Sequence, residues 1–266
     1  MPEPPQKHGS PWRDASAEVR LARQMGLAPL PADLRLSVVV PAYNESSTIE
    51  EVIRRIRQHA CDVQIVVVDD ASTDGTADVL ERLSSEDTGG SLIVIRHERN
   101  RGKGAALRTG FERATGEVVL IQDADLEYDP AEYPRLVWPI LEDKADVVYG
   151  SRFSAAVPHR VLYFWHAVAN RTLTMLSNLT TDLNLTDMET CYKAFRREVI
   201  ETVRPTLKED AFGIEPELTA KIARRGYRVY EIGISYSGRT YAAGKKIGLA
   251  DAFRAVWCIL RYWRWD

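Results

Sequence analysis

The sequence predicts an α/β fold in which a mostly parallel sheet is flanked by helices, with amphipathic helices toward the C-terminus. Two observations carry this prediction. Short apolar runs rich in valine alternate with helical segments over residues 36–149, a pattern typical of a parallel sheet buried on both faces. Polar and acidic residues follow the ends of several of these runs, where open α/β sheets bind their ligands.

The strands and helices are expected in strict alternation. Five apolar runs are expected to be strands, at residues 36–40, 63–68, 92–95, 118–121 and 147–149. The segments between them have apolar residues at helical spacing, as Ile49, Val52 and Ile56 do in the first. These segments are expected to be right-handed crossover helices, at residues 48–59, 76–83, 104–114 and 130–142.

Three regions are expected along the 266 residues. Residues 1–35 are predicted to be a flexible, proline-rich tail with one short helix at residues 15–25, because prolines interrupt regular structure. Residues 36–245 are predicted to form one folded domain, and residues 246–266 a C-terminal amphipathic helix. No run reaches the roughly 18–20 apolar residues that cross a bilayer, and no signal-peptide core is visible, so we expect a cytoplasmic protein.

The composition excludes several classes of protein. Hydrophobic residues at 45% and charged residues at 27% rule out a mostly disordered chain. With 35 basic and 38 acidic residues the net charge is −3, which argues against a nucleic-acid binder held by bulk charge. The three cysteines are far apart and form neither a zinc spacing nor a disulfide framework, so we expect a reducing compartment.

The ends of the first three strands carry residues suited to a nucleotide. Tyr43 and Glu45 follow the first strand, where they could stack on a base and accept its hydrogen bonds, or simply form a turn that caps the next helix. The adjacent carboxylates Asp69 and Asp70 end the second strand, and burying them is unfavourable unless they bind something. Lys103, between two glycines before a helix, suits an anion or lies in a flexible turn.

The fourth strand is followed by three acidic residues that could bind a metal ion. Asp123 and Asp125 are separated by the small residue Ala124, and Glu127 follows. Hard divalent cations prefer such oxygens, and Mg²⁺ or Mn²⁺ usually joins one or two carboxylates to substrate phosphates. An ion here would stabilise a diphosphate leaving group as a Lewis acid.

Taken together, these motifs resemble a known enzyme family. The segments VVVPAYNES, VVVDDASTDGT, NRGKGAALRTGF and LIQDADLEYDP, in this order, resemble the inverting family-two glycosyltransferases, whose GT-A fold is a Rossmann-like domain. The run GSRF at residues 150–153, the run DMETCYKAFR at residues 187–196 and the basic residues after Gly238 resemble, more narrowly, the dolichol- and polyprenyl-phosphate mannose or other hexose synthases. The resemblance covers residues 36–250.

The resemblance implies a role for each matching position. The implied nucleotide-sugar site comprises Pro41, Tyr43, Glu45, Val68, Asp70, Lys103, Asp123, Ala124, Asp125, Glu127, Arg239 and Lys246. Within it, the implied metal ligands are Asp123, Asp125 and Glu127, and the implied catalytic residues are Asp125, Asp187 and Arg239. Lys245 competes with Lys246 for the second phosphate-binding position, because the spacing after Arg239 is longer than the family pattern.

The acceptor side is expected at Arg152 and Glu189. An inverting transfer to a sugar hydroxyl needs a base, whereas a phosphate acceptor is already anionic, so Asp187 or Glu189 would organise the acceptor pocket. A surface turn that caps the following helix is the other interpretation. Glu215 and Glu217 are expected only to favour the N-terminus of a helix.

The predicted activity is inverting, metal-dependent transfer of mannose or glucose, from GDP-mannose or UDP-glucose, to a polyprenyl or dolichyl phosphate. Two alternatives stay open. One is a glycosyltransferase with a soluble or glycan acceptor that uses Asp187 or Glu189 as base. The other is a non-catalytic module that binds a nucleotide sugar and partners a membrane protein.

Two amphipathic segments suggest how the chain reaches a lipid. Residues 161–179 place aromatic and aliphatic side chains along one face and a polar stripe along another, and residues 249–263 combine tryptophan with arginine. Such helices can lie in the interface of a membrane, or they can pack on the core or on a partner subunit. A peripheral position on the inner face of the membrane is therefore expected, with a homo-oligomer or a membrane-protein partner as further possibilities.

Overall fold

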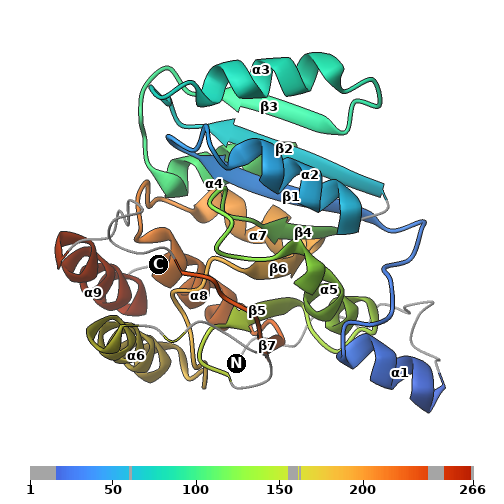
Figure 1. The fold of residues 1–266 in the computed structure, drawn as a ribbon. Coiled ribbons are helices and arrows are strands. Elements are labelled where there is room, and N and C mark those ends of the chain that lie inside the picture. The colour runs from blue at the N-terminus through green and yellow to red at the C-terminus, as the bar shows by residue number, and fades with distance from the viewer. Residues whose placement is uncertain (1–15, 60–61, 155–160, 162, 239–248, 265–266) are drawn as a thin grey trace.

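A computed structural model describes residues 16–59, 62–154, 161, 163–238 and 249–264. Its centre is a seven-stranded sheet in the order β3-β2-β1-β4-β6-β5-β7 (Figure 1). The strands are β1 (Arg35–Ala42), β2 (Asp62–Asp69), β3 (Leu92–Arg96), β4 (Val118–Ile121), β5 (Val147–Ser151), β6 (Lys193–Arg196) and β7 (Val229–Gly233). The prediction of an α/β fold with a mostly parallel sheet is confirmed, because β6 alone runs antiparallel to its neighbours β4 and β5 among these strands.

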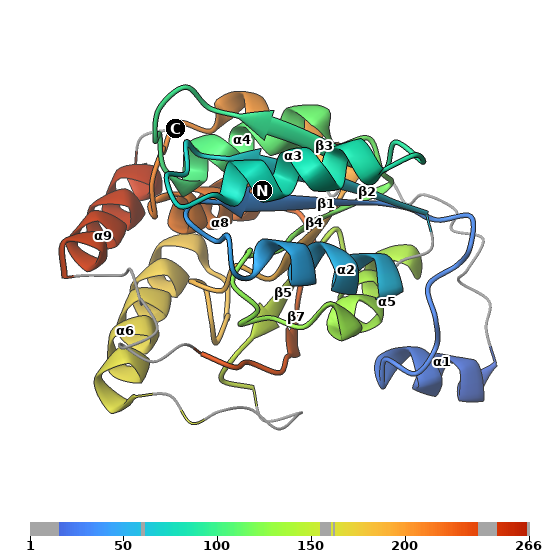
Figure 2. The same cartoon turned by 45° about the horizontal axis from the view of Figure 1, so that its top comes forward.

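The valine-rich strands form the core because helices cover both faces of the sheet. Val38, Val39 and Val40 of β1 have no exposed surface, and all four residues of β4 are buried. Helices α2 and α4 cover opposite faces beside β1 (Figure 2). The helices here are α2 (Ile49–His59), α3 (Thr76–Glu86), α4 (Lys103–Arg113) and α5 (Tyr133–Leu141). They match the four predicted crossover helices.

Glycine lets α4 approach the sheet closely. A Cβ at Gly110 would lie 2.3 Å from Cγ1 of Val39, well inside normal contact distance. The helix therefore sits directly on β1 and β2, and its N-terminus lies at the edge where the predicted site residues emerge. A larger side chain at this position would push the helix away from that edge.

The second half of the chain adds two strands that the sequence did not indicate and several helices, two of which match the amphipathic segments expected at residues 161–179 and 249–263. The strands are β6 and β7, described above. The helices are α6 (Phe164–Thr181), α7 (Arg197–Val203), α8 (Ile214–Arg224) and α9 (Leu249–Arg264). Helices α6 and α9 pack side by side and against α8 (Figures 1 and 2). No helix in the described part of the chain is long and apolar enough to cross a membrane.

Part of the predicted N-terminal tail is attached to the domain. Helix α1 (Ala17–Gln24) packs on α5, where Arg23 is buried. The guanidinium of Arg23 lies 3.8 Å from the ring centre of Trp138 and pairs with Glu142 at 3.0 Å. Residues 1–15 of the predicted tail lie outside the described residues.

Candidate active site

The loops that follow β1, β2 and β4 leave the same edge of the sheet. Pro41 of β1 is in register with Val68 of β2, and the N–H of Gln122 after β4 donates to the carbonyl of Val39 at 3.0 Å. Val68 has no exposed surface, so its side chain belongs to the core. These neighbouring loops carry the predicted site residues Tyr43, Glu45, Asp70, Asp123, Ala124 and Asp125.

The first loop is held by Glu45, which is buried at the start of α2. Its carbonyl accepts the N–H groups of Thr48 and Ile49 at 3.1 and 3.0 Å, and its Oε2 accepts the Thr48 hydroxyl at 3.0 Å. Its own N–H donates to Thr76 Oγ1, at the start of α3, at 2.9 Å. Glu45 thus ties the first loop to the second, while Tyr43 is 37% exposed at the surface.

Asp70 is satisfied by groups of the chain itself. His97 Nδ1 lies 2.6 Å from Oδ1, and the N–H groups of Arg101 and Gly102 donate to the carboxylate at 2.9 and 2.7 Å. His97 Nε2 lies 3.0 Å from the hydroxyl of Thr109 on α4. Asp70 therefore fixes the turn that begins α4, directly before Lys103.

Lys103 pairs with two acidic side chains beneath the fourth loop. Its Nζ lies 3.1 Å from Asp123 Oδ1 and 3.1 Å from Glu215 Oε1, and the thiol of Cys191 donates to the same Asp123 oxygen at 2.9 Å. Burial opposes the charge of Lys103, but Asp123, followed by Cys191 and Glu215, raises its pKa well above the usual value. Lys103 is therefore a permanent cation that orients Asp123.

Asp125 and Glu127 shape the rest of the fourth loop. Asp125 Oδ1 accepts the N–H of Glu127 at 3.1 Å, and Glu127 Oε2 accepts the hydroxyl of Tyr236 at 2.6 Å. The carbonyl of Glu127 also accepts the N–H of Ser237 at 2.9 Å. The segment after β7 is thus fastened to this loop. The predicted phosphate-binding residues Arg239, Lys245 and Lys246 lie outside the described residues.

The carboxylates of the fourth loop form only a partial set of metal ligands. In the described part of the chain, no group of three or more His, Cys, Asp or Glu side chains is placed to hold a metal ion. One oxygen of Asp123 is engaged by Lys103 and Cys191, and Glu127 accepts from Tyr236. Asp125 with Asp123 remains a donor set suited to Mg²⁺ or Mn²⁺, which often take one or two protein carboxylates and complete their shell with substrate phosphates and water.

Arg152 and Asp187, both expected on the acceptor side, form one ion pair. Nε and Nη2 of Arg152 donate to the two carboxylate oxygens of Asp187 at 2.7 and 2.8 Å, and the backbone N–H of Arg152 donates to Oδ2 at 3.0 Å. Asp187 is fully buried. Burial opposes the positive charge of Arg152, but the neighbouring Asp187 carboxylate raises the pKa of Arg152 well above the usual value. Both oxygens of the predicted base are therefore occupied, and the pair is a fixed element of the pocket.

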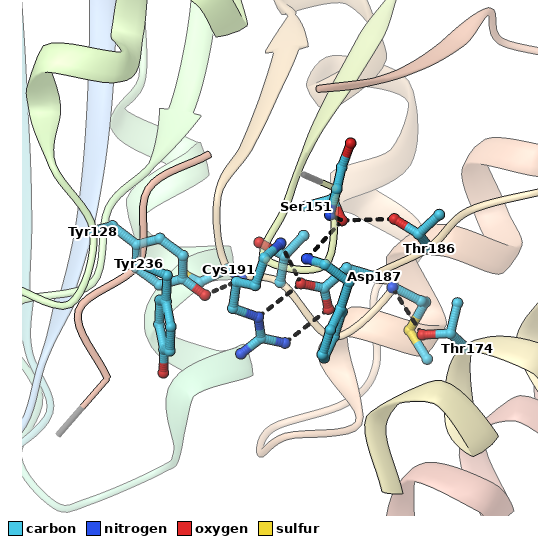
Figure 3. A network of polar contacts seen from close by, with 12 residues as sticks. Tyr128, Ser151, Thr174, Thr186, Asp187, Cys191 and Tyr236 are labelled. Carbon is cyan, nitrogen blue, oxygen red and sulfur yellow. Dashed lines mark hydrogen bonds and ion pairs between the residues drawn. The ribbon is translucent and has the colours of Figure 1, made fainter. Parts of the chain in front are cut away.

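Hydrogen bonds hold the turn around Asp187 from several sides, as Figure 3 shows. Ser151 at the end of β5 is bonded to Thr186 at 2.6 Å, and Thr174 of α6 accepts an N–H of the turn at 3.1 Å. The N–H of Cys191 donates to the hydroxyl of Tyr128 at 3.3 Å. The turn is therefore rigid and internal, and it is not the exposed helix cap that was the other interpretation.

Glu189 differs from Asp187 in having no such partner. Its Oε1 is buried and accepts no hydrogen bond within the described part of the chain. Burial, followed by the nearby charge of Glu215, raises its pKa to about 8. Lys193 lies close by and is fully buried; its ammonium donates to the carbonyls of Met188 and Thr190, and burial lowers its pKa.

Sequence reasoning missed several residues that the fold brings to the site. Glu215 was expected only to favour a helix N-terminus, and that assignment is incomplete because its carboxylate pairs with Lys103. His97 and Tyr236 lie outside the recognised motifs, and Lys193 lies within the run at residues 187–196 but was given no role. A signal for Lys193 and Glu215 does exist, since charged residues within apolar segments are rarely buried unless they are paired.

The chain is similar in sequence to proteins named as undecaprenyl-phosphate sugar transferases. An undecaprenyl-phosphate mannosyltransferase of Micrococcus luteus is 29% identical over 223 residues, which are 81% of this chain and 88% of that protein. An undecaprenyl-phosphate 4-deoxy-4-formamido-L-arabinose transferase of Pseudomonas aeruginosa is 29% identical over 225 residues, 82% of this chain. The match spans 62% of the length of that second relative.

The solved structures agree with this at the level of the fold. A glucosyl-3-phosphoglycerate synthase of Mycobacterium tuberculosis, crystallised with Mn²⁺, uridine diphosphate and glucosyl-3-phosphoglycerate, superposes with a TM-score of 0.66 at 21% identity. The superposition covers 90% of this chain and 82% of the synthase. The family model described as glycosyl transferase family 2 matches residues 37–204, more than half of the chain. The predicted resemblance is therefore confirmed, and this chain belongs to glycosyl transferase family 2.

Proposed function

We propose that the protein transfers a hexose, with inversion, from a nucleotide diphosphate sugar to a polyprenyl phosphate. The observation that carries the proposal is the shared edge of β1, β2 and β4, where Asp123 and Asp125 emerge beside the loops of Tyr43 and Asp70. Carboxylates beside a nucleotide-binding edge suit a diphosphate donor, because a divalent ion can join the two. The names of the two relatives support a polyprenyl phosphate as acceptor.

The donor would be GDP-mannose or UDP-glucose, held by Pro41, Tyr43 and the fixed turn that begins α4. Mg²⁺ or Mn²⁺ would be held by Asp125 and Asp123, with Glu127 nearby, and would supply Lewis-acid stabilisation of the departing diphosphate. Lys103 keeps Asp123 oriented through its 3.1 Å ion pair. Arg239 and Lys246, which match the basic pair of the family, would add positive charge to the diphosphate.

The acceptor chemistry favours a phosphate over a sugar hydroxyl. A phosphate oxygen attacks the anomeric carbon while the bond from that carbon to the diphosphate breaks, and the bonding electrons leave with the diphosphate. No proton has to be removed. Both oxygens of Asp187 are bound by Arg152, so Asp187 is not free to deprotonate a hydroxyl and fits a positioning role. Glu189, whose pKa is raised mainly by burial, would be the base if the acceptor were a hydroxyl.

The exposed faces of α6 and α9 suit a lipid surface. The polar stripe of α6 faces the protein, where Thr174 and Asn178 bond the backbone on either side of Asp187, at Met188 and Leu185. Most of its large apolar side chains face outward, and Trp165 is 76% exposed, although Leu173 packs in the core. An amphipathic helix packed on a core shows the opposite orientation. The exposed apolar side chains of the two helices include Phe164, Trp165, Met175, Leu179, Phe253, Trp257, Leu260 and Trp263.

A groove beside α6 is the proposed acceptor entrance. It encloses about 630 Å³, and its lining mixes polar and apolar side chains, including Phe153, Arg171, Met175, Asn178 and Leu179. The groove thus runs from the exposed face of α6 to Phe153, the neighbour of Arg152 in the sequence. A prenyl phosphate matches this mixture, with an anionic head near the arginines and an apolar chain along the helix. The protein would then lie peripherally on the inner face of the membrane.

The test is transfer by the purified full chain. Each donor, GDP-mannose and UDP-glucose, is mixed with Mn²⁺ or Mg²⁺ and either a short-chain prenyl phosphate or simple sugars. Product on the prenyl phosphate with inverted configuration is the expected result. Product on sugars alone would instead favour the soluble or glycan acceptor. Nucleotide-sugar binding without turnover for any acceptor would favour the non-catalytic module.

A further inference from the structure

The loop between α7 and α8 lies directly against the N-terminus of α4. A Cβ at Gly102 would lie 2.4 Å from the carbonyl oxygen of Asp210, and a Cβ at Gly104 would lie 2.3 Å from that of Glu209. The N–H of Ala105 donates to the Asp210 carbonyl at 3.1 Å. Because backbone touches backbone here, any displacement of residues 209–210 moves the two glycines that flank Lys103.

The side chain of Glu209 is held by α9. Its Oε1 accepts hydrogen bonds from the hydroxyl of Tyr262 at 2.9 Å and from Nη1 of Arg261 at 3.1 Å. Tyr262 is fully buried and packs with Cys258 of α9 and Ala220 of α8. Glu209 is therefore the connection between a helix with an exposed apolar face and the turn that begins α4.

Two further groups of contacts hold the loop at residues 208–210 in place. Arg108 of α4 donates to the carbonyl of Glu209 and pairs with the carboxylate of Asp210. On the other side, the N–H groups of Lys208 and Glu209 each donate to the carboxylate of Glu217 at 2.8 Å. The loop is thus clamped between α4, α8 and α9, and it has little freedom to move without moving α4.

We propose that Glu209 is a positioning residue of the donor site, which acts through Gly102 and Gly104 to hold Lys103 against Asp123. This inference rests on the proposed function, because Lys103 and Asp123 are taken to serve the diphosphate donor. It adds that α9 is a structural part of the donor site, although Glu209 Oε1 itself faces α9 and not the sheet edge. The residue would influence donor binding without touching the donor.

The test separates positioning from folding. Glu209→Ala is expected to raise the KM for the donor about tenfold while kcat changes by less than about twofold and the KM for the acceptor stays unchanged. Glu201→Gln is the matched control, because Glu201 is an exposed acid paired with Arg197 on α7. Tyr262→Phe keeps the ring in place and removes the hydroxyl, so it is expected to raise the donor KM in the same direction.

A double-mutant cycle decides the mechanism. If Glu209 acts through Tyr262, the double variant raises the donor KM by no more than the larger single change, since the two residues share one contact. Donor nucleotide affinity is also measured directly, by titrating GDP and UDP with Mn²⁺ in the absence of acceptor. An unchanged donor KM in Glu209→Ala would overturn the proposal. So would a fall in kcat together with changes in both KM values, if these accompany a fall in Tm in both variants.

The same experiment distinguishes this proposal from the proposed function. A wild-type protein that binds neither nucleotide and transfers no sugar would contradict the proposed function itself. An active wild type whose donor KM is unaffected by Glu209→Ala and by Tyr262→Phe would contradict only the positioning role.

Discussion

The guanidinium of Arg152 binds both carboxylate oxygens of Asp187, at 2.7 and 2.8 Å, and the carboxylate has no exposed surface. A buried pair of this kind stabilises only while both partners are present, since either charge alone would be left in a poorly solvated site. The pair lies beside Phe153 and Tyr236, whose rings the guanidinium approaches at 5.9 and 5.4 Å. It joins the end of β5 to the turn before β6.

Asp187→Asn is expected to destabilise the protein. Because the substitution leaves Arg152 buried without its counterion, the free energy of unfolding should fall by about 3–5 kcal/mol, and the KM for prenyl phosphate should rise. Urea unfolding followed by fluorescence measures the first effect. Glu201→Gln, which breaks an exposed pair with Arg197, should change stability by less than about 1 kcal/mol. A fully stable Asp187→Asn protein would contradict a structural ion pair.

Asp125→Asn should abolish transfer and leave the fold intact. Loss of a ligand to the proposed ion is expected to lower kcat at least about a hundredfold, because Lewis-acid stabilisation contributes several kcal/mol. Asp129→Asn is the matched control: Asp129 lies on the same loop, but its carboxylate caps a short helix through the N–H of Ala131 at 3.0 Å. Turnover near the wild-type value in Asp125→Asn would refute the metal role.

The raised pKa of Glu189 predicts a specific pH dependence of stability. Its pKa is about 8 in the folded protein against 4.5 for an ordinary Glu, so the folded state binds more protons between these values. Stability from this group is therefore present at pH 4.5 and is lost as the pH rises toward 8. Relative to wild type, Glu189→Gln should gain on the order of 3 kcal/mol between pH 5 and pH 8.

Urea unfolding of both proteins at the two pH values measures this difference. Comparing the two proteins removes the contribution of groups that titrate in the same range independently of Glu189. A constant difference between wild type and Glu189→Gln across this range would show that Glu189 titrates normally.

Gly102 should not tolerate a side chain. Its φ of +94° is strained for any other residue, and a Cβ would lie 2.4 Å from the Asp210 carbonyl oxygen. Gly102→Ala is expected to cost about 2–4 kcal/mol of stability and to weaken donor binding. Gly89→Ala is the control, since a Cβ there meets nothing within 4 Å. Thermal unfolding and nucleotide titration measure both effects, and equal behaviour of the two variants would contradict the close packing.

The apolar face of α9 should bind lipid. Replacing Phe253 and Trp257 by Glu is expected to reduce sedimentation with anionic vesicles by about tenfold or more, because both side chains are exposed and the face is flanked by arginines. Transfer to a short, water-soluble prenyl phosphate should remain. Leu27→Glu, at an equally exposed position shortly after α1, should leave vesicle binding unchanged. Undiminished sedimentation of the double variant would argue for a protein partner on this face.

Some parts of the fold and the site follow from local sequence. The valine runs and the helical spacing after Thr48 predict β1 to β5 and the crossover helices, because burial on both faces requires continuous apolar strands. Parallel strands also bring their carboxyl ends to one edge. The joint position of Tyr43, Asp70 and Asp123 could therefore be predicted without coordinates.

Tertiary structure decided which charged groups meet. Lys103 and Glu215 are 112 positions apart, and Arg152 and Asp187 are 35 apart; periodicity contains no information on such pairs. The antiparallel insertion of β6 between β4 and β5 brings Cys191 and Lys193 beneath the fourth loop. Local pattern determines which segments are strands and helices and where ligands gather, whereas long-range packing determines which acids are paired, which are buried alone and which helix face stays exposed.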